Sequence, residues 1–414
     1  MTLVDYDPGD PAVRANPWPV FHDLQAHEPV HRSSALRAWV LTRYDHVREV
    51  LLDSRFSTER IGPFIEHLPE AAREPMQVLD RAVGEWAIFQ DPPNHTRLRG
   101  LMNRAFTPNA AERMRPVAQR VVDRLLDEVS DAGQMDVIRE FAFRLPILVI
   151  CEMLGLPGEH FQMFKDWCDE LALFVGGSRA IEDKYPRARR AAHELIDYFR
   201  RQIADRRTSP RDDLISGLVT ARDEAARLSE DELVAQCILL LFAGNEATSN
   251  LIGNGTLVLL RHPAALDQLR RNPDIIQSAV EELLRFESPA QSVVRLATED
   301  IEIDGTMIRK GDRLHLLLNA ANRDPTRFPD ADTLDLLRDP NPHIAFGHGI
   351  HYCIGGPLAK VEAQVAFSTM LRRFEHLTLE IDEPEWLDSM TFRGVKSLPV
   401  SFRAVLNSDS REAV

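Results

Sequence analysis

A glycine-rich cysteine loop near the C-terminal end of the chain, FGHGIHYCIGGP (Phe346–Pro357), is the starting point for interpreting the sequence. Helical periodicity follows it, so Cys353 lies where the loop enters a helix. The positive end of a helix and its free backbone N–H groups stabilise a thiolate, and glycines let the main chain curve closely around the sulfur. Pro357 suits the first helical turn, where a missing N–H costs nothing. The sequence therefore predicts a sulfur that is suited to bind a metal.

Three interpretations of this loop are open from its residues alone. In the first, Cys353 is an inert buried thiol, the commonest state of a free cysteine. In the second, His348, His351 and Cys353 bind zinc, although the loop lacks the paired spacings of structural zinc sites. In the third, the thiolate is the axial ligand of a heme iron, and His351 reaches a heme propionate.

A long helix is predicted over Ser229–Arg261. Its first residue forms a capping box with Glu232, and Pro263 follows its far end. Cys237–Ala243 is apolar on all sides, as in a helix that passes through a core. A glycine and the carboxylate of Glu246 then interrupt the apolar run, which costs free energy unless the acid has a partner.

The remaining sequence predicts one domain. No repeat, low-complexity tract or Gly/Ser-rich linker divides the 414 residues. β-type runs occur in about residues 1–60, helical periodicity dominates about 90–285, and β-prone runs around turns at Asp304–Gly305 and Lys310–Gly311 accompany the cysteine loop over about 286–414. We therefore expect a mainly α protein with small β-sheets and a long central helix.

Charge and composition exclude several classes of protein. Lys and Arg total 49 and Asp and Glu total 64, and the net charge of −15 argues against a general affinity for nucleic acid or acidic membranes. The N-terminus lacks the features of an export signal, and no apolar run approaches the ~18 residues that span a bilayer. The four cysteines are too widely spaced to suggest a disulfide framework. We expect a cytoplasmic protein without nucleic-acid or membrane partners.

With these motifs, the sequence resembles the cytochrome P450 family, specifically its soluble bacterial members. Phe346–Gly355 matches the family's cysteine loop, Phe-Gly-x-Gly-x-His/Arg-x-Cys-x-Gly, at every defined position. Glu282–Arg285 matches its Glu-x-x-Arg, and the central helix matches its oxygen-activating helix in part. Asp91–Arg99 is similar to the helix whose His and Arg hold heme propionates. The four motifs occur in family order, so the resemblance implies a cytochrome P450 fold over residues 1–414.

The resemblance implies roles for individual residues. Cys353 is implied as the ligand to the iron of heme b. The other residues implied in binding this cofactor are His95, Arg99, Arg295, His351, Phe346, Gly347 and Gly355. Glu282 and Arg285 resemble the family's structural pair that braces the cysteine loop, and Arg338 is the expected third partner.

The central helix departs from the family at one position. Most members carry an acid followed directly by Thr, whereas here Glu246 is followed by Ala247, and the hydroxyl comes one place later at Thr248. One residue is about 100° of helix rotation, so Thr248 is not expected to point at bound O2 as a Thr at 247 would. We expect an ordered water, a substrate hydroxyl, or Asn245 with Glu246 to complete proton delivery.

Electrons are expected from a separate protein. Only 414 − 353 = 61 residues follow Cys353, too few for a flavin domain, and no Gly-x-Gly-x-x-Gly fingerprint opens a helix after a strand. The implied partners are a ferredoxin and its reductase, with NAD(P)H as the ultimate donor. A basic patch on the cysteine side is expected to attract the ferredoxin. Its candidate members are Arg97, Arg104, Arg113, Arg115, His348 and Lys360.

The substrate pocket is expected to be apolar with few polar groups, which suits a hydrophobic small molecule. Part of it should come from a loop region over residues 57–90. The candidate lining residues are Ile65, Trp86, Phe174, Phe242, Ala243, Gln291 and Val294.

The predicted function is that of a heme-thiolate monooxygenase. It would insert one oxygen atom of O2 into an apolar small molecule, by hydroxylation or epoxidation, with electrons from a ferredoxin system. One alternative is a peroxide-driven or non-monooxygenase heme-thiolate enzyme, which the alanine at position 247 favours. The other is a heme-binding sensor or carrier without turnover, against which the carboxylate of Glu246 in the central helix argues.

Overall fold

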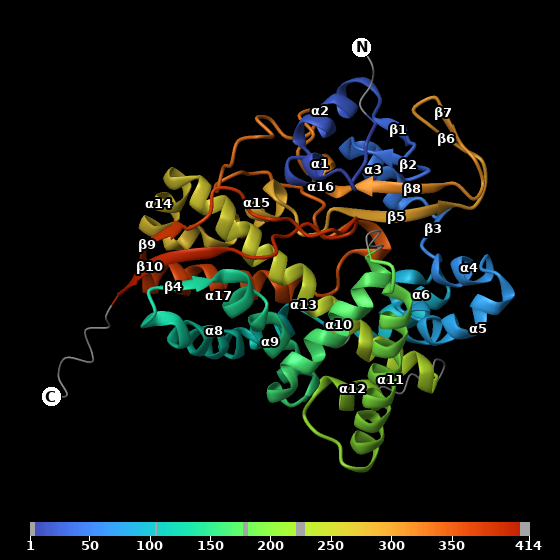
Figure 1. Ribbon diagram of the computed structural model, residues 1–414, viewed down its shortest axis with the longest axis horizontal. Helices are drawn as coiled ribbons and strands as arrows, with labels where there is room; N and C mark the ends of the chain where they lie inside the picture. Colours follow the sequence, from blue (N-terminus) through green and yellow to red (C-terminus); the bar gives the residue numbers. More distant parts are fainter. Residues whose placement is uncertain (1–4, 104–105, 177–180, 221–227, 406–414) are drawn as a thin grey trace.

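The computed structural model describes residues 5–103, 106–176, 181–220 and 228–405. Helices make up most of the molecule, and a smaller part beside them carries the main β-sheet (Figure 1). The predicted fold class, a single mainly α domain with small sheets and a long central helix, is confirmed. Within the described ranges, no helix is both long and apolar enough to cross a membrane.

The main sheet combines strands from the N-terminal part of the chain with strands from the segment after residue 286. Its five strands lie in the order β1-β2-β8-β5-β3, in which β2 and β8 are parallel and the other neighbours are antiparallel. The strands are β1 Val30–Ser33, β2 Ala38–Leu41, β3 Phe56–Ser57, β5 Ser292–Ala297 and β8 Arg313–Leu317. The short helices beside them are α1 Pro11–Ala15, α2 Trp18–His27, α3 Tyr44–Leu52 and α16 Leu318–Asn322. The first 60 residues therefore pack with the segment after residue 286.

Two smaller sheets complete the β-structure. The first has the order β4-β10-β9, with β4 Gln134–Asp136, β9 Phe374–Leu379 and β10 Pro399–Ala404. The second is the hairpin of β6 Ile301–Ile303 and β7 Thr306–Ile308, which turns at Asp304 and Gly305 as the sequence predicts. Strand β4 lies inside the region predicted to be helical, because its pairing with the distant β10 is invisible to local periodicity.

The helical part surrounds α13, Glu230–Arg261, in the middle of the molecule (Figure 1). The other helices are α4 Ile61–Glu66, α5 Glu70–Leu79, α6 Asn94–Asn103, α7 Pro108–Arg113, α8 Arg115–Ser130, α9 Arg144–Leu154, α10 Phe161–Val175, α11 Lys184–Thr208, α12 Leu214–Thr220, α14 Pro263–Arg271, α15 Ile276–Phe286 and α17 Gly356–Arg373. Helix α13 packs against α9, α11, α15 and α17. Its predicted extent is confirmed, and Ser229 and Glu232 form the predicted capping box.

The segment predicted as a loop over residues 57–90 is largely helical, so that prediction is wrong. It contains α4, α5 and a π-helical turn over Asp80–Gly84. Prolines inside both helices obscure the periodicity, since proline usually ends a helix. The buried side chains of Ile61, Ile65, Met76 and Leu79 hold the segment against the core nevertheless.

Candidate active site

The cysteine loop folds tightly at the start of α17. Gly347 and Gly349 have φ values of 72° and 73°, the left-handed region that glycine adopts without strain. A Cβ at Gly349 would lie 2.9 Å from the carbonyl oxygen of Leu51, so a side chain there would displace the loop. The backbone N–H of Cys353 donates to the carbonyl oxygen of Phe346 over 3.0 Å and closes the loop. Helix α17 then begins at Gly356, with Pro357 in its first turn.

Cys353 is the exposed member of the four free cysteines. Its surroundings act on the thiol in opposite directions. Burial by the loop raises the pKa of Cys353, whereas backbone N–H groups of Gly355 and Gly356 and the guanidinium of Arg99 lower it. By contrast, burial raises the pKa of both Cys151 and Cys237 to about 12 with no such donors. Cys353 is therefore the cysteine placed to act as a thiolate ligand.

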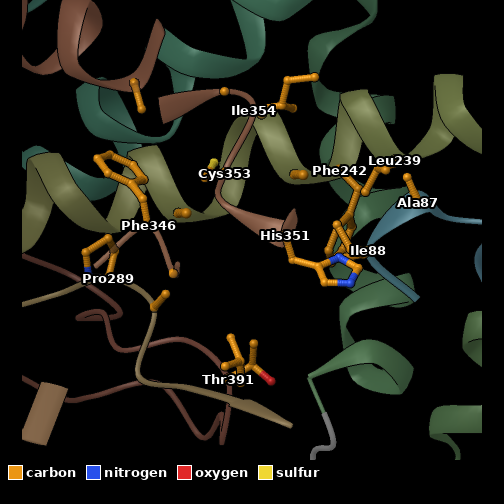
Figure 2. A pocket seen from close by; sticks show the side chains of 18 of the residues that line it. Ala87, Ile88, Leu239, Phe242, Pro289, Phe346, His351, Cys353, Ile354 and Thr391 are labelled. Atoms are coloured by element: carbon orange, nitrogen blue, oxygen red, sulfur yellow. The ribbon is translucent and has the colours of Figure 1, made fainter. Parts of the chain in front are cut away.

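Cys353 lines a cavity with a volume of about 310 Å³. In Figure 2, Cys353 and Ile354 lie on the loop as it passes in front of α13, and Leu239 and Phe242 project from that helix. Pro289 and Thr391, from two other segments, lie on the opposite side of the view. Most of the lining side chains are apolar. The cavity therefore combines a sulfur donor with walls that exclude water.

All eight predicted cofactor residues line this one cavity, and four of them, two arginines and two histidines, form a cluster within it. The rings of His95 and His351 lie 4.2 Å apart between centroids. Burial, together with Arg295 and His95, lowers the pKa of His351 to about 3, and its Nδ1 is buried without a hydrogen-bond partner. Arg99 donates to the carbonyl oxygen of Tyr352 over 2.6 Å. Arg295 donates to the carbonyl oxygen of Val294 over 3.0 Å.

Neither Arg99 nor Arg295 has a carboxylate partner among the residues that the structure describes. Arg295 is buried and Arg99 is half-buried, and neither has an ion-pair partner among the described residues. Together with an imidazole nitrogen that has no described hydrogen-bond partner, they form a site for acidic groups. The propionates of a heme fit this requirement, and the sulfur of Cys353 fits its iron. The zinc interpretation fails in the described part of the chain, where no three His, Cys, Asp or Glu side chains are arranged to hold a metal ion.

Glu282, Arg285 and Arg338 come together as the resemblance implies. Arg338 Nε donates to Glu282 Oε1 over 3.2 Å, and Asn341 Nδ2 donates to Glu282 Oε2 over 3.1 Å. These contacts tie α15 to the segment that leads into the cysteine loop. Their position is consistent with a structural role, since none of the three residues lines the cavity.

The central helix presents its polar residues in two directions. Ala247 and Thr248 both line the cavity, although only 5 % of Thr248 is exposed, so Thr248 lies closer to the site than the helical rotation predicts. Asn245 and Glu246 do not line it. Burial raises the pKa of Glu246 to about 7, and the carboxylate of Asp169 on α10 adds to the rise. Glu246 is therefore a carboxyl that changes protonation near neutral pH, one residue away from the cavity wall.

Three of the seven residues predicted for the substrate pocket line the cavity. Phe242, Ala243 and Val294 line the cavity. Ile65, Trp86, Phe174 and Gln291 do not, and this corrects the prediction. Trp86 is completely buried behind the wall, where it packs on Phe242 at a centroid distance of 5.1 Å. The pattern of apolar residues does not distinguish a side chain that lines a cavity from one that packs behind it.

Three cations of the predicted basic patch form ion pairs with acidic residues of the chain. Arg97 pairs with Glu232, Arg115 Nε lies 2.8 Å from Glu112, and Lys360 Nζ lies 2.8 Å from Glu281. Arg104 lies outside the described residues. Arg113 and His348 remain, and no acid in the described ranges pairs with Arg113. The patch is therefore smaller than the sequence predicts.

Two charged residues of the cavity wall, Arg60 and Glu362, are missing from the sequence prediction. Glu362 has a detectable signal, because it follows Leu358 at i+4 and so places a carboxylate on the apolar face of α17. Its Oε2 is buried without a hydrogen-bond partner, and burial raises its pKa well above the ordinary value. Arg60 follows β3 in an irregular segment, where the sequence offers no signal.

Comparison with known proteins gives one family. The family model described as Cytochrome P450 matches residues 31–402. The chain is 40 % identical to the "Biotin biosynthesis cytochrome P450" of Bacillus subtilis (strain 168), over 94 % of this chain and 96 % of that protein. It is 38 % identical to the "Cytochrome P450 monooxygenase PikC" of Streptomyces venezuelae, over 94 % of this chain and 92 % of that protein.

Solved structures agree. The crystal structure of P450BioI in complex with hexadec-9Z-enoic acid ligated acyl carrier protein has a TM-score of 0.88 and 39 % identity, and covers 95 % of this chain and 99 % of that chain. Myxobacterial cytochrome P450 CYP267B1 in complex with myristic acid has a TM-score of 0.87 and 39 % identity, with coverage of 95 % and 98 %. The chain belongs to the cytochrome P450 family of heme-thiolate oxidoreductases that use O2, and specifically to its bacterial monooxygenases.

Proposed function

We propose that this cytochrome P450 binds heme b through Cys353 and uses O2 to hydroxylate or epoxidise an apolar small molecule. Electrons would come from a ferredoxin and its reductase, with NAD(P)H as the ultimate donor. The observation that carries the proposal is the position of the Cys353 sulfur at a water-excluding cavity with a cationic edge.

Different residues of the chain would bind the cofactor and orient the substrate. Bound heme supplies the activation of O2, which a thiolate ligand favours. Arg99, Arg295, His95 and His351 would hold its propionates, since they line the cavity without acidic partners. The walls formed by α13 and the segment of Pro289–Arg295 would orient the substrate and keep water away.

The relatives support an apolar substrate. The ligands of two similar structures are a hexadecenoic acid attached to its carrier protein and myristic acid. Another relative, 40 % identical, is named "Vitamin D(3) 25-hydroxylase". These molecules share a large apolar part, which agrees with the apolar lining of the cavity.

Proton delivery is proposed to use Thr248, with water or a substrate hydroxyl beside Ala247. Among the described residues, Thr248 is the hydroxyl-bearing residue of α13 that lines the cavity. Glu246 can exchange protons near neutral pH on the outer side of this helix turn. Reaction of the enzyme with peroxide remains the second candidate, because Ala247 removes the hydroxyl that most family members carry at this position.

Two measurements test the proposal. In the first, the purified protein is reduced and exposed to carbon monoxide. We expect the Soret band of a thiolate adduct, which Cys353→His should convert to that of an imidazole adduct. In the second, ferredoxin, reductase and NADPH are supplied with isotopically labelled O2 and a library of apolar compounds.

We expect a product that carries one labelled oxygen atom. Product formation with peroxide alone, and none with the ferredoxin system, would establish the peroxide-driven alternative. Heme incorporation without consumption of NADPH for any compound would establish a sensor or carrier.

A further inference from the structure

Arg60 places a third guanidinium group in the cavity. It immediately precedes α4, and it lines the same cavity as Cys353. Its guanidinium carbon lies 4.6 Å from the centre of the Phe89 ring, which also lines the cavity. A cation–π contact of this kind holds the charge in place while it leaves the N–H groups in the guanidinium plane available.

Among the described residues, no acidic group forms an ion pair that neutralises the charge of Arg60. In the described ranges, Arg60 forms no ion pair and no side-chain hydrogen bond. Burial lowers the pKa of Arg60 to about 10, and the charged groups that act on it, Arg295 and Arg313, are both cations. The side chain therefore stays positively charged at neutral pH in a position where a positive charge is unfavourable without a partner.

The other charged groups of the cavity do not satisfy Arg60. Arg99 and Arg295 suffice for the two propionates of a heme, one guanidinium for each carboxylate. Asp91, behind the wall, acts on Arg295 but not on Arg60. Glu362 forms no ion pair with Arg60 among the described residues, and burial raises its pKa well above the ordinary value. Arg60 therefore remains as a half-buried cation that an external anion can neutralise.

We propose that Arg60 binds the carboxylate of the substrate, so that the enzyme takes an apolar carboxylic acid and holds it by its acidic end. This inference rests on the proposed function and adds the chemical class of the substrate. A guanidinium presents two parallel N–H groups that match the two carboxylate oxygens. The apolar part of the acid would extend along the walls formed by Ile88, Phe242 and Val294.

The test measures binding to the heme-loaded protein without any electron donor. Straight-chain, terpenoid and aromatic carboxylic acids are each compared with the corresponding alcohol and methyl ester. Dissociation constants come from the absorbance change of the cofactor and from calorimetry. We expect at least one acid to bind at least about tenfold more tightly than its alcohol, a difference of about 1.4 kcal/mol, because only the acid forms charge-assisted hydrogen bonds with the guanidinium.

Two variants at position 60 and a matched control locate the effect. Arg60→Gln should abolish the preference for the acid and leave the alcohol unchanged. Arg60→Lys should retain part of the preference, since it keeps the charge but lacks the planar fork. Arg32→Gln is the control, because Arg32 lies 5.2 Å over the ring of Trp39, outside the cavity wall, and should change neither affinity.

Three results would overturn the inference. The first is that no acid binds more tightly than its alcohol, including the case in which none binds. The second is an undiminished acid preference in Arg60→Gln. The third is loss of heme from Arg60→Gln, measured as the heme-to-protein ratio, with the acid preference per heme unchanged; Arg60 would then be a propionate residue. Since binding is measured without turnover, failure of the proposed monooxygenation gives a separate and distinguishable result.

Discussion

Glu282 and Arg285 form a two-point ion pair in which neither side chain is exposed. Arg285 Nε donates to Glu282 Oε2 and Nη2 donates to Oε1, both over 2.8 Å. The remaining N–H groups of Arg285 reach backbone carbonyl oxygens, including that of Ala331 over 2.8 Å. A buried ion pair of this kind adds little stability compared with apolar residues of similar volume at the same positions. Removal of one partner, however, leaves an uncompensated buried charge.

The first prediction follows from this asymmetry. Glu282→Gln preserves the shape of the side chain but leaves the Arg285 charge without its carboxylate. We expect the free energy of unfolding to fall by about 3–5 kcal/mol and the heme-to-protein ratio to fall with it. Denaturant unfolding followed by circular dichroism measures the first quantity, and absorbance measures the second.

The control for this prediction is Glu112→Gln. Glu112 and Arg115 have the same i,i+3 spacing and a contact of 2.8 Å, but their side chains are 56 % and 37 % exposed. Loss of such a pair should cost no more than about 0.5 kcal/mol. Equal losses for the two variants would mean that burial of the Glu282 pair has no special importance.

The second prediction concerns pH and Glu246. Its pKa is about 7 in the folded protein and about 4.5 in the unfolded chain. Between pH 4.5 and pH 7, the folded protein therefore keeps a proton on Glu246 that the unfolded chain has released. Stability from this group is therefore complete below about pH 4.5 and is lost as the pH rises to 7. Glu246→Gln should exceed the parent in free energy of unfolding by at most roughly 3 kcal/mol at pH 8, and by less than about 1 kcal/mol at pH 5.

Asp169→Asn provides the companion measurement. Asp169 raises the pKa of Glu246, whereas Lys165 beside it lowers that pKa. Removal of the aspartate charge should move the window of pH-dependent stability to lower pH. A gain for Glu246→Gln that is the same at pH 5 and pH 8 would show that the Glu246 carboxyl titrates normally in the folded state.

The third prediction concerns the approach of the electron donor. Arg113 lies at the end of α7, which packs on α17 next to the cysteine loop, and no described acid pairs with it. Arg113→Glu should slow reduction by an acidic ferredoxin and flatten its dependence on ionic strength, since electrostatic attraction acts mainly on the association rate. Stopped-flow absorbance measures the rate at several salt concentrations.

Arg309→Glu is the control for this experiment. Arg309 belongs to the turn after β7, on the β-rich side of the molecule, and pairs with Asp300 over 2.7 Å (Figure 1). Both variants change the net charge by the same amount. A difference between their reduction rates is therefore due to the position of the changed charge. Equal slowing would indicate a general charge effect and would exclude a docking surface at α7.

The sequence predicted the elements whose causes are local. The capping box of Ser229 and Glu232, the turn at Asp304 and Gly305, and the helix start at Pro357 depend on neighbouring residues, and all three are present. The grouping of the cofactor residues came from the family resemblance, because no local pattern places Arg295 beside His351.

Long-range side-chain pairing could not be predicted. Glu232 completes the capping box of α13, and the same carboxylate also pairs with Arg97 of α6, which removes that cation from the basic patch. Trp86 belongs to an apolar run that could equally line a cavity or fill the core, and the structure buries it completely. Such outcomes depend on which elements pack together, and that information is not contained in the period or composition of a segment.

The last prediction concerns the hydroxyl of the central helix. Thr248→Val preserves the shape of the side chain but removes the O–H of Thr248, a residue that lines the cavity in the described structure. We expect the product formed per NADPH consumed to fall at least about threefold, since a positioned proton donor contributes substantially to such steps. Thr248→Ser should retain most of the coupling. Ser249→Ala is the control, because the neighbouring hydroxyl is buried away from the cavity without a hydrogen-bond partner.

Ala247→Thr restores the hydroxyl at the position where most family members carry it. If Thr248 with water or a substrate hydroxyl already delivers protons, the added hydroxyl should alter the selectivity among substrates without a general gain in coupling. Coupling and product distribution are measured together, by NADPH consumption and mass spectrometry, across several substrates. A uniform gain in coupling with unchanged selectivity would mean that the helix lacks an effective donor, and Thr248→Val should then have no effect, since a residue that delivers no proton has none to lose.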